Sequence, residues 1–82
     1  MTKRIEINEY IVADPAICHG KPTFKGTRIM VCQILEMLKE GESIKTIRRH
    51  FPSIKSFHIK AALDYAASLT KSGKNVIVSL QA

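Results

Sequence analysis

The stretch Gly20–Val31, GKPTFKGTRIMV, separates a strand-like beginning of the chain from a helical remainder. Its proline cannot donate to a sheet ladder and its glycines accept backbone angles that other residues resist, so tight turns are favoured. Thr23-Phe24 and Thr27-Arg28-Ile29 contain β-forming residues and flank Lys25-Gly26. We therefore predict a β-hairpin, with Gly26 at the positive-φ position of its turn.

The residues before this stretch favour β-structure. Between positions 4 and 13, RIEINEYIVA, apolar side chains occupy mostly odd positions, and the alternation is interrupted once, at Glu9. Such a period of two predicts one half-buried β-strand or two short ones. Asp14-Pro15 ends the pattern, because the residue before a proline is restricted and the proline nitrogen carries no hydrogen. The predicted β-element spans residues 4–29.

Three amphipathic helices are predicted after the stretch. Apolar side chains recur at helical spacing in each, and the expected bounds are about 31–40, 43–51 and 56–69. Gly41 is suited to end the first helix, Ser43 to cap the second, and Pro52 to end the second. The short turn between the second and third helices matches a helix-turn-helix, although a plain packed helix pair without DNA function fits the pattern equally well.

The predicted fold is therefore α+β and mostly α: a three-helix helix-turn-helix core preceded by a short N-terminal β-hairpin region. Residues 1–70 are expected to form a single small domain, followed by a C-terminal tail at 71–82. Within the tail, Asn75–Leu80 has the sequence NVIVSL and is a candidate β-strand. A lone strand needs a partner, whether the N-terminal strand, a second copy or another protein.

Composition narrows the class of protein. The chain carries 13 Lys and Arg against 7 Asp and Glu, a net charge of +6, which favours a polyanionic partner over mere solvation of surplus lysines. A chain this short buries only about 60–65% of its unfolded surface, so a homodimer is expected. No apolar run approaches the roughly 18–20 residues of a membrane span, and two cysteines are too few for a disulfide framework. A cytoplasmic protein without a membrane partner is predicted.

The sequence predicts neither catalysis nor metal binding. Its carboxylates are scattered, and no nucleophile lies in a recognisable catalytic motif. Cys18, His19, Cys32, His50 and His58 are of metal-ligand types, but they lack the paired spacings of zinc sites, such as CxxC. We therefore expect no enzymatic activity, no metal and no cofactor.

Positive charge gathers on the predicted second helix and the turn after it. Lys45 and Arg49 are four residues apart, a like-charge pair that costs an isolated helix about 0.2–0.5 kcal/mol unless an anion such as phosphate offsets it. The third helix offers poor base-reading chemistry, because Lys60 is the only cation on its outward face and Asp64 repels phosphate. Backbone-type contacts with weak sequence reading are therefore expected. The predicted DNA-binding residues are Lys45, Arg48, Arg49, Lys55, His58 and Lys60.

A second surface is predicted along the third helix. The apolar stripe of this helix is Ile59, Ala62, Leu63, Ala66 and Leu69. Beside it, Phe57, Ala61 and Tyr65 are spaced four apart, which is typical of a protein-docking seam or of the edge of the core. Arg28, before the first helix, is suited to fix the hairpin to a carboxylate such as Asp14 or to reach an acidic site on a partner. The predicted partner-binding residues are Arg28, Phe57, Ala61, Tyr65, Val76 and Val78.

Several motifs fall in the order found in a known family. They are Asp14-Pro15, Cys18-x-Gly20-Lys21-Pro22, Gly26-Thr27-Arg28-Ile29-x-Val31, Gly41-x-Ser43, Phe51-Pro52 and Ile59-x-Ala61-Ala62-Leu63-x-Tyr65-Ala66. In these motifs, between Asp14 and Ala67, the chain resembles domain-of-unknown-function family 433, although His19 stands where a glycine is expected. The residues expected to fix the geometry of the motif are Pro15, Gly20, Pro22, Gly26, Thr27, Arg28, Gly41 and Pro52.

The resemblance implies a homeodomain-like helix-turn-helix core with an N-terminal β-element. It further implies an antitoxin of a type II toxin–antitoxin pair, which binds operator DNA and neutralises a PIN-like ribonuclease toxin. Because the active site of such a nuclease is a cluster of carboxylates, a basic partner is electrostatically suited to it. The predicted function is a DNA-binding, antitoxin-like regulator. The alternative is a dimerising or partner-binding module that never contacts DNA.

Overall fold

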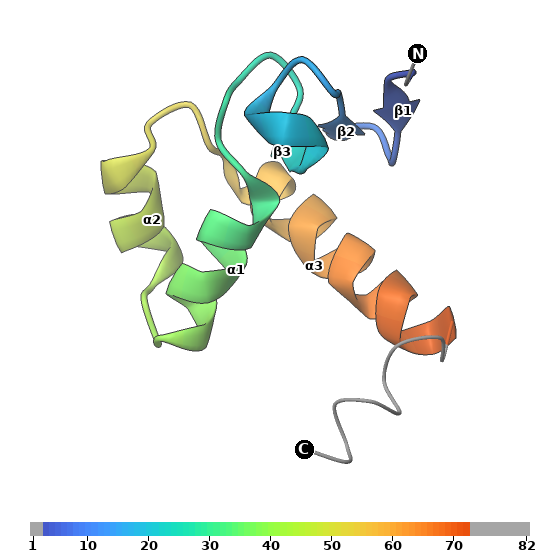
Figure 1. The fold of residues 1–82 in the computed structure, drawn as a ribbon. Helices are drawn as coiled ribbons and strands as arrows, with labels where there is room; N and C mark the ends of the chain where they lie inside the picture. Colours follow the sequence, from blue (N-terminus) through green and yellow to red (C-terminus); the bar gives the residue numbers. More distant parts are fainter. Residues whose placement is uncertain (1–2, 73–82) are drawn as a thin grey trace.

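The computed structural model describes residues 3–72 of the chain. These residues form a three-stranded antiparallel sheet, in the order β1-β2-β3, and three helices that follow it (Figure 1). The elements are β1 (Ile5–Glu6), β2 (Ile11–Ala13), the 3-10 turn η1 (Cys18–Gly20), β3 (Pro22–Phe24), α1 (Val31–Lys39), α2 (Ile44–His50) and α3 (Ser56–Ser72). The fold is α+β and dominated by helices, which confirms the predicted class.

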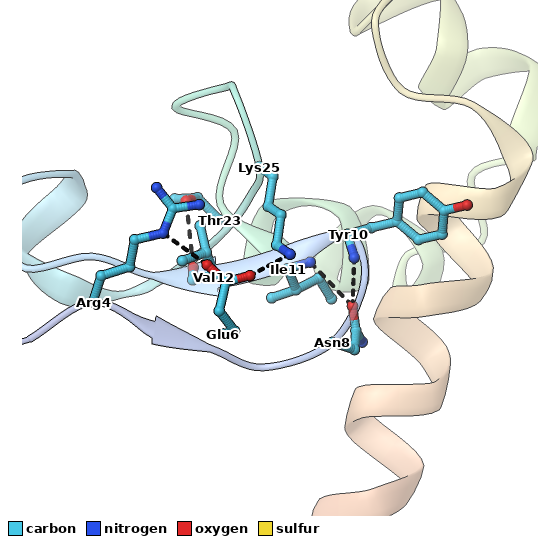
Figure 2. Close-up of polar contacts among 8 residues, drawn as sticks. All are labelled: Arg4, Glu6, Asn8, Tyr10, Ile11, Val12, Thr23 and Lys25. Atoms are coloured by element: carbon cyan, nitrogen blue, oxygen red, sulfur yellow. Dashed lines mark hydrogen bonds and ion pairs between the residues drawn. The ribbon is translucent and has the colours of Figure 1, made fainter.

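The N-terminal β-structure consists of two short strands joined by a turn. β1 pairs with β2 in antiparallel register. Asn8 shapes the turn, because its Oδ1 accepts hydrogen bonds from the backbone N–H groups of Tyr10 (2.9 Å) and Ile11 (3.0 Å) (Figure 2). The interruption of the alternating sequence pattern at Glu9 therefore marks a change of direction within the β-element.

The Glu6 carboxylate links the edge strand β1 to the opposite edge of the sheet. Glu6 on β1 accepts a hydrogen bond from Arg4 at 2.9 Å and forms an ion pair with Lys25, the residue after β3 (Figure 2). The hydrogen bond from Lys25 is the main cause that lowers the pKa of Glu6, and the bond from Arg4 lowers it further. Because this ion pair faces water, it orients the strands more than it stabilises them.

β3 pairs with β2, and the turn after β3 has the predicted geometry. Gly26 has a φ of +78°, and the Thr27 hydroxyl closes the turn by donating to the Phe24 carbonyl at 2.8 Å. The predicted second arm of the hairpin, at 27–29, is not a strand. After these residues, the described chain forms one isolated β-bridge, between Met30 and Thr23, because α1 begins at Val31.

α1 ends at a glycine, as predicted. Gly41 has a φ of +90°, and its N–H donates to the Leu38 carbonyl at 3.0 Å. The N–H of Glu42 donates to the Met37 carbonyl, also at 3.0 Å. These two bonds form a Schellman motif, which satisfies carbonyl groups that the helix end would leave without a partner. The motif turns the chain directly into α2.

One hydrophobic core joins the sheet to all three helices. Its buried members are Ile11, Phe24, Val31, Ile34, Ile47, Ile54, Ile59, Ala61 and Ala62. α1 packs against both α2 and α3, and the sheet lies next to the start of α3 (Figure 1). The arrangement leaves α2 on one side of α1, and α3 with the sheet on the other.

The buried face of α3 coincides only in part with the predicted apolar stripe, of which Ile59 and Ala62 are buried as expected. Leu63 and Leu69 belong to that stripe, but their side chains are 49% and 47% exposed. Ala61, predicted beside the stripe, is only 7% exposed. The reason is the N-terminal turn, which lies against this side of the helix: the Asn8 Nδ2 donates to the Ala61 carbonyl at 3.4 Å. α3 also continues to Ser72 instead of ending at residue 69.

Candidate nucleic-acid interface

Three of the predicted DNA-contacting cations share one face of α2. Ile47 is fully buried and anchors this helix in the core. At 3.6 residues per turn, Lys45 and Arg49 lie about 160° from Ile47, one on each side of the opposite pole, and Arg48 lies about 100° from it. All three side chains are exposed. Their charges therefore point away from the core into solvent.

None of these cations is neutralised within the described chain. The ion pairs of residues 3–72 join Arg4 to Glu6, Lys25 to Glu6, Lys39 to Glu40, and Lys60 to Asp64. α2 itself, IKTIRRH, contains no acidic residue. The repulsion between Lys45 and Arg49 is therefore not relieved by an ion pair, and the face presents a positive potential to an approaching anion.

A groove runs beside two of the cations. It has a volume of about 490 Å³ and is lined by Ile44, Lys45, Arg48 and Pro52. Ile44 is 45% exposed, so the groove has an apolar wall next to two positive charges. The cap residue Ser43 holds the start of the helix, since its Oγ accepts a hydrogen bond from the third residue of α2 at 3.1 Å.

The turn between α2 and α3 holds a fourth cation close to the same groove. Ile54 is fully buried and anchors the turn. The Lys55 Nζ donates a hydrogen bond to the Pro52 carbonyl at 3.3 Å. Because Pro52 also lines the groove beside α2, Lys55 adds its charge near one end of that groove.

His58 is held in a structural position and does not present a charge to solvent. Its Nδ1 accepts a hydrogen bond from the Lys55 N–H at 2.9 Å, which caps the start of α3. Only an unprotonated ring nitrogen can accept this bond. Burial is the main cause that lowers the pKa of His58, and the charge of Lys55 lowers it further. The ring centroids of Tyr10, Phe24 and Phe57 lie 4.6–5.5 Å away. This placement gives His58 a structural role, and its contact with DNA stays a prediction.

The other predicted residues of α3 fall into different environments. The Lys60 Nζ forms an ion pair with the Asp64 carboxylate at 3.0 Å, so part of its charge is offset. Ala61 is buried in the core, so only a small part of its side chain remains accessible in the predicted docking seam. Phe57 is 47% exposed, and Tyr65 is half-buried against the core. The seam is therefore recessed at its centre.

Of the remaining predicted partner-binding residues, the structure describes only Arg28. Arg28 is exposed, and within residues 3–72 its side chain makes no ion pair with Asp14 or any other carboxylate. Asp14 instead accepts a hydrogen bond from the Ala16 N–H at 2.9 Å. Val76 and Val78, with the candidate strand Asn75–Leu80, lie outside the described residues.

A second cavity contains residues that sequence analysis did not single out. It has a volume of about 340 Å³ and is lined by Asn8, Glu9, Tyr10, Phe57, Lys60, Ala61 and Asp64. The first three belong to the turn between β1 and β2, and the others to α3. The sequence signal that could have predicted this turn is Asn8, because asparagine within a strand-like segment favours a turn.

A family model described as "Protein of unknown function (DUF433)" matches residues 11–66, more than half of the chain. The chain belongs to this family. The match begins at β2 and ends within α3, so the DUF433 region contains the three-helix core and leaves β1 outside it. No curated protein and no solved structure matches the chain.

The backbone conformation of η1 explains why the motif Cys18-x-Gly20 contains a glycine. Cys18, His19 and Gly20 all have positive φ angles, of 51°, 58° and 84°. Only glycine adopts this conformation without steric cost, so the glycine expected at position 19 would relieve strain that His19 retains. Pro22 begins β3, a position where its missing N–H is tolerated, and Pro15 lies in the turn that follows β2.

Other classes of site are not assembled by the described residues. Between residues 3 and 72, no three His, Cys, Asp or Glu side chains lie close enough to hold a metal ion, and Cys18 and Cys32 are free thiols. Over the same range, no helix combines the length and the apolar character that crossing a membrane requires.

Proposed function

We propose that this DUF433 domain is a DNA-binding regulator of the antitoxin type, which contacts the sugar–phosphate backbone through α2 and the turn after it. The observation that carries the proposal is the exposed face of Lys45, Arg48 and Arg49, none of which forms an ion pair among the described residues. Phosphate contacts of this kind position a protein on a duplex and supply affinity that does not depend on sequence.

The outward face of α3 favours backbone binding over base reading. Lys60 is tied to Asp64, and the neighbouring exposed side chains include Leu63 and Ala67. Discrimination between bases in the major groove usually depends on Arg, Asn or Gln side chains, which this face lacks. We therefore expect binding with weak sequence preference and strong dependence on salt.

The antitoxin part of the proposal rests on the family membership and on charge. A net charge of +6 suits neutralisation of a nuclease whose active site is a cluster of carboxylates, such as a PIN-like ribonuclease. Co-expression with the product of the adjacent reading frame tests this part. Formation of a complex together with restored growth supports it, and growth inhibition unchanged by the chain contradicts it.

The DNA part is tested by fluorescence anisotropy with a labelled duplex. Affinity should fall by orders of magnitude between about 50 and 200 mM salt, because each neutralised phosphate contributes about −0.9 to the slope of log K against log salt. Changing Lys45, Arg48 and Arg49 together to glutamine should reduce the magnitude of this slope by about three. An affinity that barely changes with salt would rule out backbone binding.

A matched control separates the face of α2 from net charge alone. The triple variant Lys3→Gln, Lys21→Gln and Lys71→Gln removes the same charge from three exposed cations elsewhere on the chain. This variant should retain most of the slope and affinity of the natural chain. An equal loss in both triple variants would show that charge acts without a defined site.

The second candidate function is a protein-interaction module without DNA binding. Exposed apolar side chains favour it, because Phe57 and Ile44 are 47% and 45% exposed on a small domain. On this alternative, the natural chain binds DNA only as weakly as any basic protein does, and the α2 triple variant binds it equally weakly. The variant still binds its protein partner. The anisotropy measurement and the co-expression experiment therefore distinguish the two candidates.

A further inference from the structure

The groove between the N-terminal turn and α3 combines aromatic rings with carboxylates. Its lining includes the small, buried side chain of Ala61 and the aromatic rings of Tyr10 and Phe57. A smaller cavity of about 210 Å³, which shares Asn8 and Asp64 with the first, continues it along α3. The two cavities are therefore neighbours at the junction of the N-terminal turn and the helix.

The walls of this groove are held in place before any ligand binds. Asn8 accepts hydrogen bonds within its own turn and donates from Nδ2 to the Ala61 carbonyl at 3.4 Å, which joins the turn to α3. The Tyr10 and Phe57 ring centroids are 4.9 Å apart, and both rings contact His58 (Figure 2 shows Tyr10 directed at α3). Walls fixed in this way lose little conformational entropy when a ligand is bound.

The charge of the groove is opposite to the charge of the chain. Two of the seven acidic residues line it, in a protein of net charge +6. Asp64 is paired with Lys60, whereas the exposed carboxylate of Glu9 makes no ion pair or hydrogen bond within residues 3–72. A carboxylate beside two aromatic rings is the combination that attracts a cationic side chain, by ion pairing and by cation–π contact.

We propose that this groove binds an arginine or lysine side chain presented by a partner protein. The aliphatic stem lies against Tyr10, Phe57 and Ala61, and the cationic group pairs with Glu9. Arginine is favoured over lysine, because its planar guanidinium stacks on aromatic rings and forms two parallel hydrogen bonds with a carboxylate. The site lies on the sheet side of α1, away from the cations of α2, and it does not depend on DNA binding (Figure 1).

The test is an amide NMR titration of the isotope-labelled full chain with three short peptides. The probes are acetyl-Leu-Arg-Leu-amide, the same peptide with neutral citrulline in place of arginine, and the same peptide with glutamate there. The arginine peptide should shift the amides of residues 8–10 and 57–64 and should bind best. The citrulline peptide keeps the shape without the charge and should bind about threefold more weakly, as expected for loss of an exposed cation–π contact and ion pair.

Variants locate the binding in the groove. Phe57→Leu keeps an apolar side chain without the ring and should weaken the arginine peptide about threefold. Glu9→Gln changes an exposed carboxylate outside the core and should weaken it about twofold. The matched control Glu42→Gln removes a carboxylate from a different groove, beside Met37 and Phe51, and should leave binding unchanged.

Several results would overturn the proposal. They are an arginine peptide that shifts no amides of the groove, equal binding of the arginine and citrulline peptides, and equal weakening by Glu42→Gln and Glu9→Gln. Amide shifts of the groove that appear on raising the protein concentration alone would assign it to a second copy of this chain, which also contradicts binding of a separate partner.

Discussion

His58 serves two structural purposes with one neutral ring. Its Nδ1 accepts the Lys55 N–H at the start of α3, in the place where a capping box usually has glutamate or glutamine. Its ring also packs among Tyr10, Phe24 and Phe57, which joins the sheet to the helix. A proton on Nδ1 would remove the hydrogen bond, and burial of the ring already opposes the charged form.

This residue makes stability depend on pH. Because the pKa of His58 is lowered in the fold, the unfolded chain takes up a proton first as the pH falls below the ordinary value of 6.5. The free energy of unfolding should decrease from that pH downward, and the decrease should be complete below the lowered pKa. Urea denaturation across this range measures it.

The variant His58→Gln isolates the contribution of this ring. Glutamine at this position can still accept the hydrogen bond from Lys55 but stays neutral at every pH of the experiment. The variant should start from a lower stability, because ring packing is lost, and should show a flatter pH profile. The difference between the two profiles isolates the contribution of His58. Parallel profiles would contradict the assignment.

At the scale of elements, the connection between α1 and α2 decides where the cationic face lies. The two helices are joined by a Schellman motif at Gly41 and by the cap at Ser43, with little chain between them. α2 is only seven residues long and has one fully buried side chain, Ile47. A helix this short depends on its ends and on that anchor for its orientation.

We therefore expect Gly41→Ala to destabilise the protein by about 1–2 kcal/mol, the cost of a left-handed residue with a Cβ. A Cβ at this position would meet no heavy atom within 4 Å, so the cost comes from the φ of +90° and not from a clash. Gly41→Asn should cost less, because asparagine tolerates this conformation. Thermal denaturation measures both variants, and an Ala variant as stable as the natural chain would contradict the motif.

At the scale of the whole molecule, burial and charge are divided between the two sides of α1. α2 carries exposed cations on one side, while the sheet and α3 form an aromatic groove with carboxylates on the other (Figure 1). The core connects the two sides through Ile34 and Ile47 on the helices and Phe24 on the sheet. A surface substitution on one side can therefore disrupt binding there and leave the other side folded, provided that the core is intact.

Two side-chain truncations of similar chemistry test the division between buried and exposed apolar residues. Ile47→Ala removes a fully buried side chain and should cost about 2–5 kcal/mol, because it leaves a cavity in the core. Leu63→Ala acts on a side chain that is 49% exposed and should change stability by no more than about 0.5 kcal/mol. Urea denaturation compares them directly. Similar losses in both variants would show that α3 buries the face that its apolar pattern predicts.

The chain's own sequence determined the class of fold, the order of the elements and most helix ends. These features depend on local chemistry: periodicity predicted the three helices, Gly26 the positive φ of its turn, Gly41 the end of α1, and Ser43 the cap of α2. The exposed cations of α2 were predictable for the same reason, since a seven-residue helix with one apolar anchor has an evident outer face.

Only the tertiary structure decided which side of α3 the N-terminal turn covers and where His58 and Ala61 lie. The hydrogen bond from Asn8 to Ala61 joins residues 53 positions apart, and no periodicity within α3 contains that information. The turn between β1 and β2 lies against the side of the helix that its own pattern assigns to an outer seam, so Ala61 is buried, whereas Leu63 is left exposed. Local preferences fix which elements form, whereas contacts between distant segments fix which of their faces remain available for binding.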